Sequence, residues 1–223
     1  MIAALRSSFS DRRIAVVASL GVLSLFVVAM AIGRVLYTRT FDQTGITWNL
    51  FLAWVPFVLA LVVYVRSRAG SSRPALAALG VLWLLFFPNA PYIVTDLKHV
   101  GGGSGIPILY DVLLLSAAAW TGLLLGLASL YLMHAVARRL LGATSAWALV
   151  VGALALSSFG IYLGRVQRWN SWDVFIRPGA LLGQIADGFH PAPLALTVLL
   201  TSFLLASYLV FYSFARMSAL IRD

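Results

Sequence analysis

Residues 84–96 read Leu-Leu-Phe-Phe-Pro-Asn-Ala-Pro-Tyr-Ile-Val-Thr-Asp, an apolar run of membrane-spanning character that two prolines interrupt. Proline has no N–H to donate, and its ring clashes with the carbonyl four residues back, so Pro88 and Pro91 would free two carbonyls of a helix. At membrane depth a freed carbonyl is tolerated only against protein or a wet cavity. Because Asn89 lies inside the break and Asp96 just beyond it, this segment predicts the wall of a polar site near one membrane face.

The composition around this segment is that of an integral membrane protein. Of the 223 residues, 61% are hydrophobic and only 10% are charged, whereas soluble proteins carry roughly 25% charged residues. The chain has no cysteine, which excludes disulfides and thiolate chemistry. Its net charge of +9 comes from arginines in short segments between apolar runs. We attribute that charge to contacts with lipid headgroups and not to nucleic-acid binding.

The apolar runs predict an all-α fold with one domain over residues 1–223. The expected spans are about 14–33, 46–65, 74–95, 107–133, 145–164 and 191–214. We expect a six-helix transmembrane bundle with a proline-broken third helix and a short interfacial helix, within 174–185, between spans five and six. A cleaved signal peptide is the alternative for the first run, because residues 29–31 have the small-x-small form of a cleavage site. The length of the run favours a retained helix.

Six spans place both termini on one side of the membrane. Of the sixteen Lys and Arg residues, ten lie in segments on that side and six on the other. Cytoplasmic loops carry the excess of Lys and Arg in membrane proteins. We therefore expect both termini in the cytoplasm.

The span ends on the opposite, extracytoplasmic side hold most of the unusual polar residues. Ionisable groups near membrane depth are costly, and by default they mark a functional site. We therefore predict an Asp/Arg/Asn pocket at this face. Its candidate members are Asn49, Asn89, Tyr92, Asp96, Tyr110, Asp111, Tyr162, Arg165, Arg168, Asn170 and Asp173.

The charged candidates divide into two roles. Asp96, Asp111 and Asp173 are the candidate catalytic residues, as a general base or a metal ligand. We expect Asp96, Asp111 or Asp173 to pair with Arg165 or Arg168, whose guanidinium groups would also hold a phosphate or carboxylate. The other members are candidate ligand-binding residues.

Structural alternatives stand beside these roles. An Asp at a helix start, such as Asp111, is favoured by the helix dipole alone. Buried Asp–Arg pairs can serve only to fix the tilt of a helix. His134, on the cytoplasmic side, is expected at the surface.

No cofactor is predicted from the sequence. Asp96 and His99 lie one helical turn apart and are the residues to consider for a divalent metal. The three histidines are far apart in sequence, and one falls at the opposite face, so we assign no metal.

Five segments carry a resemblance to a known family. They are Trp48–Pro56, Leu85–Leu97, Tyr110-Asp111, Phe159–Arg165 and Arg168–Asp173. On these segments the chain resembles a bacterial family of multi-pass membrane proteins known as domain of unknown function 1361. The resemblance implies a multi-pass protein of the bacterial cytoplasmic (inner) membrane and implies no reaction.

Three functions fit these observations. The first is a pocket that binds or processes a small polar, anionic or lipid-headgroup ligand, with enzymatic activity left open. The second is a small-solute or ion transporter built on the broken third helix, which would need a polar path to Ser116, Thr121, Ser157 or Ser158. The third is a non-catalytic membrane partner subunit. The expected partners are the lipid bilayer and an unidentified small-molecule or lipid ligand. The nearly uncharged helix middles favour the first function.

Overall fold

A computed structural model describes residues 2–41, 45–101, 105–166, 179 and 191–220. Its elements are α1 (Ile2–Thr38), α2 (Gly45–Arg68), α3 (Arg73–Phe86), α4 (Asn89–Tyr92), the 3-10 helix η1 (Ile93–His99), α5 (Ile108–Leu141), α6 (Ala143–Val166) and α9 (Pro191–Leu220). Over the described residues the chain is helical and has no strand, so the predicted all-α class is confirmed.

Within the residues that the structure describes, six segments are long and apolar enough to cross a membrane. They cover residues 14–38, 45–68, 73–99, 108–141, 143–165 and 193–217. All six expected spans are present, but the first and the fourth extend further than predicted. The interfacial helix expected within 174–185 lies outside the described residues.

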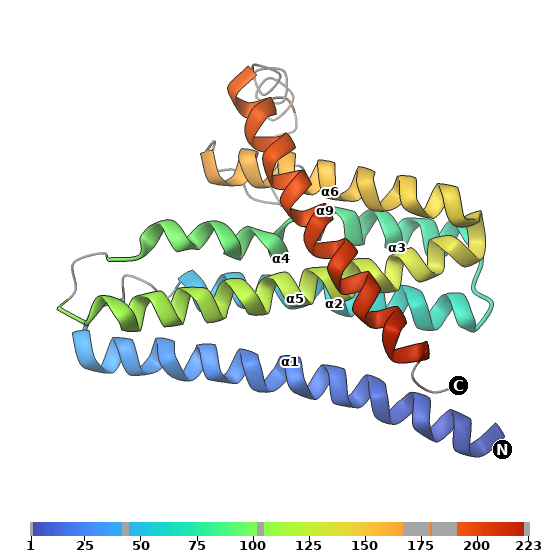
Figure 1. The fold of residues 1–223 in the computed structure, drawn as a ribbon, viewed down its shortest axis with the longest axis horizontal. Coiled ribbons are helices and arrows are strands. Elements are labelled where there is room, and N and C mark those ends of the chain that lie inside the picture. The colour runs from blue at the N-terminus through green and yellow to red at the C-terminus, as the bar shows by residue number, and fades with distance from the viewer. Residues whose placement is uncertain (1, 42–44, 102–104, 167–178, 180–190, 221–223) are drawn as a thin grey trace.

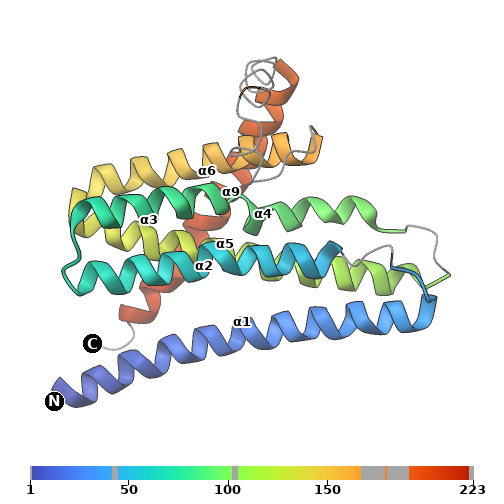
Figure 2. The same ribbon diagram turned by 180° about the vertical axis from the view of Figure 1, so that it is seen from behind.

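The helices form a bundle with the two termini at the same end (Figure 1). α1, α2, α5 and α6 run roughly side by side, and α9 crosses α5 and α6 obliquely. Seen from behind, α3 is followed by α4 alongside α2 (Figure 2). We call the end that holds both termini the terminal end. The distal end is the opposite one, where α1, η1 and α6 finish and α2 and α5 begin.

α5 is the central helix of the bundle. Of its most apolar window 61% is buried inside the protein, against 11% for the span in α9. One hydrophobic cluster, which includes Trp83, Leu130 and Tyr208, packs around the half of α5 nearer the terminal end. A second cluster, which includes Val27 and Leu114, packs around its distal half. α9 therefore lies at the periphery, with large apolar side chains turned outward toward lipid.

The length of α5 corrects the expectation for His134. Because the helix continues to Leu141, His134 lies within the span and is only 1% exposed. Its Nδ1 is 2.7 Å from the Tyr208 hydroxyl of α9. The prediction that His134 lies at the surface was wrong.

Local hydrogen bonds at the proline break satisfy the carbonyls of Phe86 and Phe87. Ala90 donates its N–H to the carbonyl of Phe87, which Pro91 would otherwise leave free, at 3.2 Å. The side-chain amide of Asn89 donates to the Phe86 carbonyl at 2.9 Å. Asn89 therefore contributes to the geometry of the break itself.

The broken segment lies against protein, as a break at membrane depth requires. Ala90 and Ile93 are fully buried. A Cβ added to Gly122 of α5 would meet the Ala90 carbonyl oxygen at 2.6 Å, and one added to Gly160 of α6 would meet Pro88 Cγ at 3.3 Å. Glycine at these positions lets both helices approach the break closely.

A buried polar chain joins the second, third and fourth spans. Trp83 Nε1 donates to Ser129 Oγ at 2.7 Å, and Ser129 Oγ donates to the Pro56 carbonyl at 3.0 Å. Ser129→Ala would leave the buried indole N–H without its acceptor. We expect the free energy of unfolding to fall by about 1–3 kcal/mol, measured by denaturant unfolding in detergent.

Ser202→Ala is the matched control, because Ser202 is exposed on α9 and bonds only within its own helix, to the Val198 carbonyl. Its unfolding curve should match that of the wild type. Equal destabilisation by the two substitutions would contradict the assigned role of Ser129.

Candidate functional site

A cavity of about 520 Å³ lies at the distal end of the bundle. Its polar lining consists of Arg34, Asn49, Asp96, Lys98, His99 and Arg165. The apolar lining includes Ile46 and Leu115. These residues come from α1, α2, η1, α5 and α6, so the first five spans together form the cavity.

Asp96 is the central side chain of the cavity. It is 5% exposed on η1. Its Oδ2 accepts a hydrogen bond from Asn49 Nδ2 of α2 at 2.9 Å, and its Oδ1 accepts one from Arg165 Nη2 of α6 at 2.5 Å. The expected pairing of Asp96 with Arg165 is therefore present, and one carboxylate joins the second, third and fifth spans.

Arg165 is fixed by two further contacts. Its Nε donates to Thr95 Oγ1 at 2.7 Å. Its guanidinium carbon lies 4.3 Å from the centroid of the Tyr92 ring, a distance at which a cation is attracted to the ring face. Tyr92 thus acts on the cavity by positioning Arg165, because it is not itself among the lining residues.

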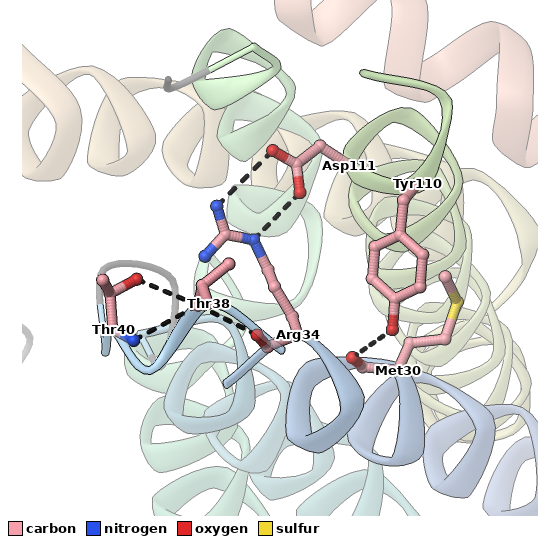
Figure 3. A network of polar contacts seen from close by, with 6 residues as sticks. All are labelled: Met30, Arg34, Thr38, Thr40, Tyr110 and Asp111. Carbon is pink, nitrogen blue, oxygen red and sulfur yellow. Dashed lines mark hydrogen bonds and ion pairs between the residues drawn. The ribbon is translucent and has the colours of Figure 1, made fainter. Parts of the chain in front are cut away.

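Asp111 forms a second, deeper ion pair with Arg34 (Figure 3). Arg34 Nε donates to Asp111 Oδ1 at 2.9 Å, and Arg34 Nη2 lies 3.5 Å from Oδ2. Both residues are only 2% exposed. Arg34 lines the cavity whereas Asp111 does not. Asp111 therefore reaches the cavity only through Arg34. Of the acids considered as partners of Arg165 or Arg168, Asp96 has such a partner, whereas Asp111 pairs with Arg34.

Sequence reasoning missed Arg34 because it was placed at the end of the first span. The signal was present, since Val35 and Leu36 continue the apolar run beyond it. α1 in fact extends to Thr38, which places Arg34 inside the helix and next to α5.

Tyr110 anchors α1 to α5 beside this ion pair (Figure 3). Its hydroxyl donates to the Met30 carbonyl at 2.7 Å. A Cβ on Gly33 would lie 3.0 Å from the same hydroxyl, so a small residue is needed there. The contact explains Tyr110 as a structural residue of the α1–α5 interface.

The comparison with protein families adds one result. A family model described as Protein of unknown function (DUF1361) matches residues 48–207. The chain belongs to this family. No curated protein and no solved structure matches the chain. Membership in DUF1361 and the six apolar helices together make the chain a multi-pass membrane protein.

The matched DUF1361 segment contains most of the cavity but not all of it. Asn49, Asp96, Asp111 and Arg165 fall within residues 48–207. Arg34 lies outside that segment, on α1. In this chain, α1 thus supplies both one wall of the cavity and the cation that neutralises Asp111.

Several candidate residues lie elsewhere. Tyr162 is buried in α6 and, like Asn89, is not among the residues that line the cavity. Arg168, Asn170 and Asp173 lie outside the described residues.

The groups considered for a metal are arranged loosely. His99 is exposed, and its Nδ1 lies 3.2 Å from the Asp96 carbonyl oxygen and 3.9 Å from Asp96 Oδ1. Within the described ranges, no three Asp, Glu, His or Cys side chains come together in a way that could hold a metal. Both carboxylate oxygens of Asp96 are already hydrogen-bonded, to Asn49 and Arg165.

The charges around the cavity do not cancel. Asp96 balances Arg165, and Asp111 balances Arg34. Lys98, which is exposed on η1, also lines the cavity. The described side chains of this site therefore carry an excess positive charge, and they offer hydrogen-bond donors from guanidinium, ammonium and amide groups.

Proposed function

We propose that the distal cavity binds a small anionic ligand, a molecule that carries a carboxylate or phosphate, including a lipid headgroup. The observation that carries this proposal is the convergence of Arg34, Lys98 and Arg165 on one cavity in which Asp96 is the only acidic lining residue among those described. A volume of about 520 Å³ lies within the range of roughly 300–1,000 Å³ that is typical of small-molecule sites.

The arrangement of Arg165 supports anion recognition. Thr95 accepts a hydrogen bond from Nε and Asp96 accepts one from Nη2, and the Tyr92 ring lies against the face of the guanidinium group. A guanidinium group presents five N–H donors in a fixed plane that matches carboxylate and phosphate oxygens. Because its orientation is already set, little side-chain entropy would be lost on binding. Lys98 would add an ammonium charge at the cavity wall.

Binding is favoured over catalysis by the surroundings of Asp96. The Asp96 carboxylate is held by Asn49 and by the Arg165 guanidinium, and a proton accepted by that carboxylate would weaken its ion pair with Arg165. We therefore propose that Asp96 orients Arg165 and does not act as a base.

Of the four helix-middle hydroxyls that a transport path would need, Ser157 and Ser158 are buried in α6, whereas the other two give a transporter no support. Ser116 is exposed on the outside of α5, and the buried Thr121 hydroxyl donates within its own helix, to the Ala117 carbonyl at 2.7 Å. Leu115, which lines the cavity, is part of the distal hydrophobic cluster. A cavity with an apolar floor is the arrangement of a binding site that does not cross the membrane.

We propose that this cavity faces the extracytoplasmic side of a bacterial inner membrane. The support is the excess of Lys and Arg in the segments at the terminal end, ten of sixteen, which the positive-inside rule assigns to the cytoplasm.

A ligand panel tests the proposed function. Thermal unfolding of the detergent-purified protein would be followed with citrate, glycerol 3-phosphate and inorganic phosphate. We expect at least one of them to stabilise the wild type, by about 2.7 kcal/mol at a hundred times its Kd. Lys98→Gln should weaken that stabilisation without changing the unbound protein, because Lys98 is exposed. Arg165→Gln should abolish it.

Arg39→Gln is the matched control. Arg39 lies at the same end of the bundle and is exposed, but it is not among the residues that line the cavity. Its ligand response should equal that of the wild type. The proposal fails if none of the three anions stabilises the wild type, or if Arg39→Gln weakens the response as much as Lys98→Gln.

A further inference from the structure

Two arginines from different helices converge on one tyrosine near the terminal end. Arg138 Nη1 of α5 donates to the Tyr212 hydroxyl oxygen of α9 at 2.7 Å, and Arg216 Nη1 approaches the same oxygen at 3.4 Å. The Arg216 guanidinium carbon also lies 5.7 Å from the centroid of the Tyr212 ring. A phenol hydroxyl carries no formal charge, so these bonds compensate neither positive charge.

No described carboxylate compensates them either. The acidic side chains whose surroundings the structure gives are Asp96 and Asp111, and both belong to ion pairs at the distal end. Two guanidinium groups that share one acceptor repel each other. An anion between them would remove that repulsion.

The shared tyrosine is held rigidly by a buried aromatic cluster. The Tyr212 ring is stacked on His134 with centroids 5.3 Å apart, and it meets Trp147 of α6 edge-on at 5.3 Å. His134 is itself fixed by the Tyr208 hydroxyl at 2.7 Å. His134 and Tyr208 are almost completely buried. Side chains of α5, α6 and α9 therefore fix the position of the Tyr212 oxygen, to which the two guanidinium groups are bonded.

The position of this cluster in the bundle identifies the anion. Arg138 lies in the last turn of α5, and Arg216 lies near the end of the last span; both side chains are exposed. Aromatic and basic residues at span ends lie at the depth of the lipid headgroups. Phosphate is the anion that occurs at that depth, and guanidinium groups bind it through paired hydrogen bonds.

We infer that Arg138 and Arg216, aligned by Tyr212, bind the phosphate of an anionic phospholipid in the leaflet at the terminal end. This site is separate from the distal cavity and does not depend on the function proposed for it. Tyr131 lies beside the site, since the centroid of its ring is 6.1 Å from that of Tyr212.

Lipid binding to the full-length protein tests this inference. Native mass spectrometry would count the lipids retained by detergent-purified protein after titration with phosphatidylglycerol or phosphatidylcholine. We expect the wild type to retain phosphatidylglycerol in preference to phosphatidylcholine. Arg138→Gln and Arg216→Gln should each weaken that binding by about tenfold, the usual scale for one charge-assisted hydrogen bond.

Arg139→Gln is the matched control, because Arg139 is the exposed neighbour of Arg138 on the same turn of α5. It should retain phosphatidylglycerol like the wild type, and so should Arg39→Gln, which lies at the distal end but does not line the cavity. If Arg138→Gln fails to fold, Arg216→Gln tests the same prediction, because Arg216 lies on the peripheral helix α9.

Two results would overturn the inference. Equal weakening by Arg139→Gln and Arg138→Gln would mean that only diffuse positive charge attracts the lipid. Displacement of phosphatidylglycerol by millimolar inorganic phosphate, with retention of that phosphate dependent on Arg138, would show that the occupant is free phosphate and not a lipid.

Discussion

Replacement of Arg34 by Met is expected to lower the free energy of unfolding strongly. Asp111 is 2% exposed and would lose the cation that neutralises it. Breaking a buried ion pair by removing one partner costs about 3–5 kcal/mol, a large part of the 5–15 kcal/mol that typically stabilises a folded protein. The readout is the yield of monodisperse protein by size-exclusion chromatography in detergent, followed by denaturant unfolding.

The double variant Arg34→Met, Asp111→Leu should recover most of the lost stability. Exchange of a whole buried pair for apolar residues of similar volume is often neutral or stabilising. Arg39→Met, a substitution of an exposed arginine at the end of the same segment, is the control and should behave like the wild type. A stable Arg34→Met, or a double variant no better than the single one, would show that the pair contributes little.

The same double variant separates structure from binding. Arg34 lines the distal cavity as well as pairing with Asp111. A folded double variant would retain Lys98 and Arg165 but lack one of the three cations. We therefore expect it to bind the stabilising anion more weakly than the wild type while the rest of the bundle is unchanged.

Gly122→Ala is expected to have the second large effect. The added Cβ would lie 2.6 Å from the Ala90 carbonyl oxygen and 2.9 Å from Ile93 Cδ1, and both residues are fully buried. Either α5 or the broken segment must move, at a cost of about 1–3 kcal/mol. Because η1 follows directly and carries Asp96, the displacement should also weaken anion binding at the distal cavity.

Two other glycines make this a graded series. A Cβ on Gly126 would meet Ala90 Cβ at 3.3 Å, a contact that a small shift relieves, whereas one on Gly152 would meet nothing within 4 Å. Denaturant unfolding should rank Gly122→Ala as most damaging, Gly126→Ala as intermediate and Gly152→Ala as neutral. A Gly122→Ala variant as stable as Gly152→Ala would contradict the packing described for the break.

The sequence alone was sufficient for features that depend on local pattern. The six spans follow from apolar length, and the break in the third follows from Pro88 and Pro91. The pair of Asp96 and Arg165 could also be predicted. Successive spans alternate in direction, so the ends of the third and fifth spans lie at the same end of the bundle.

Features that depend on which helices are neighbours could not be predicted from the sequence. Arg34 and Asp111 are 77 positions apart, and nothing in either segment shows that α1 packs beside α5. His134 was misjudged for a related reason, since its burial comes from Tyr208 and Trp147 on two other spans. Residue type and spacing do not encode such lateral packing.

The tight winding of η1 determines the direction in which Asp96 points. A 3-10 helix turns about 120° per residue, so Ile93 and Asp96, three positions apart, stand directly above one another, whereas an α-helix would offset them by about 60°. They are the two buried residues of this element. Rewinding the segment as an α-helix would swing the carboxylate through about a sixth of a circle, away from Asn49 and Arg165. The 3-10 winding thus sets the angle of the carboxylate, and a third span that stayed α-helical to its end would have to place its acid at a different position in the chain.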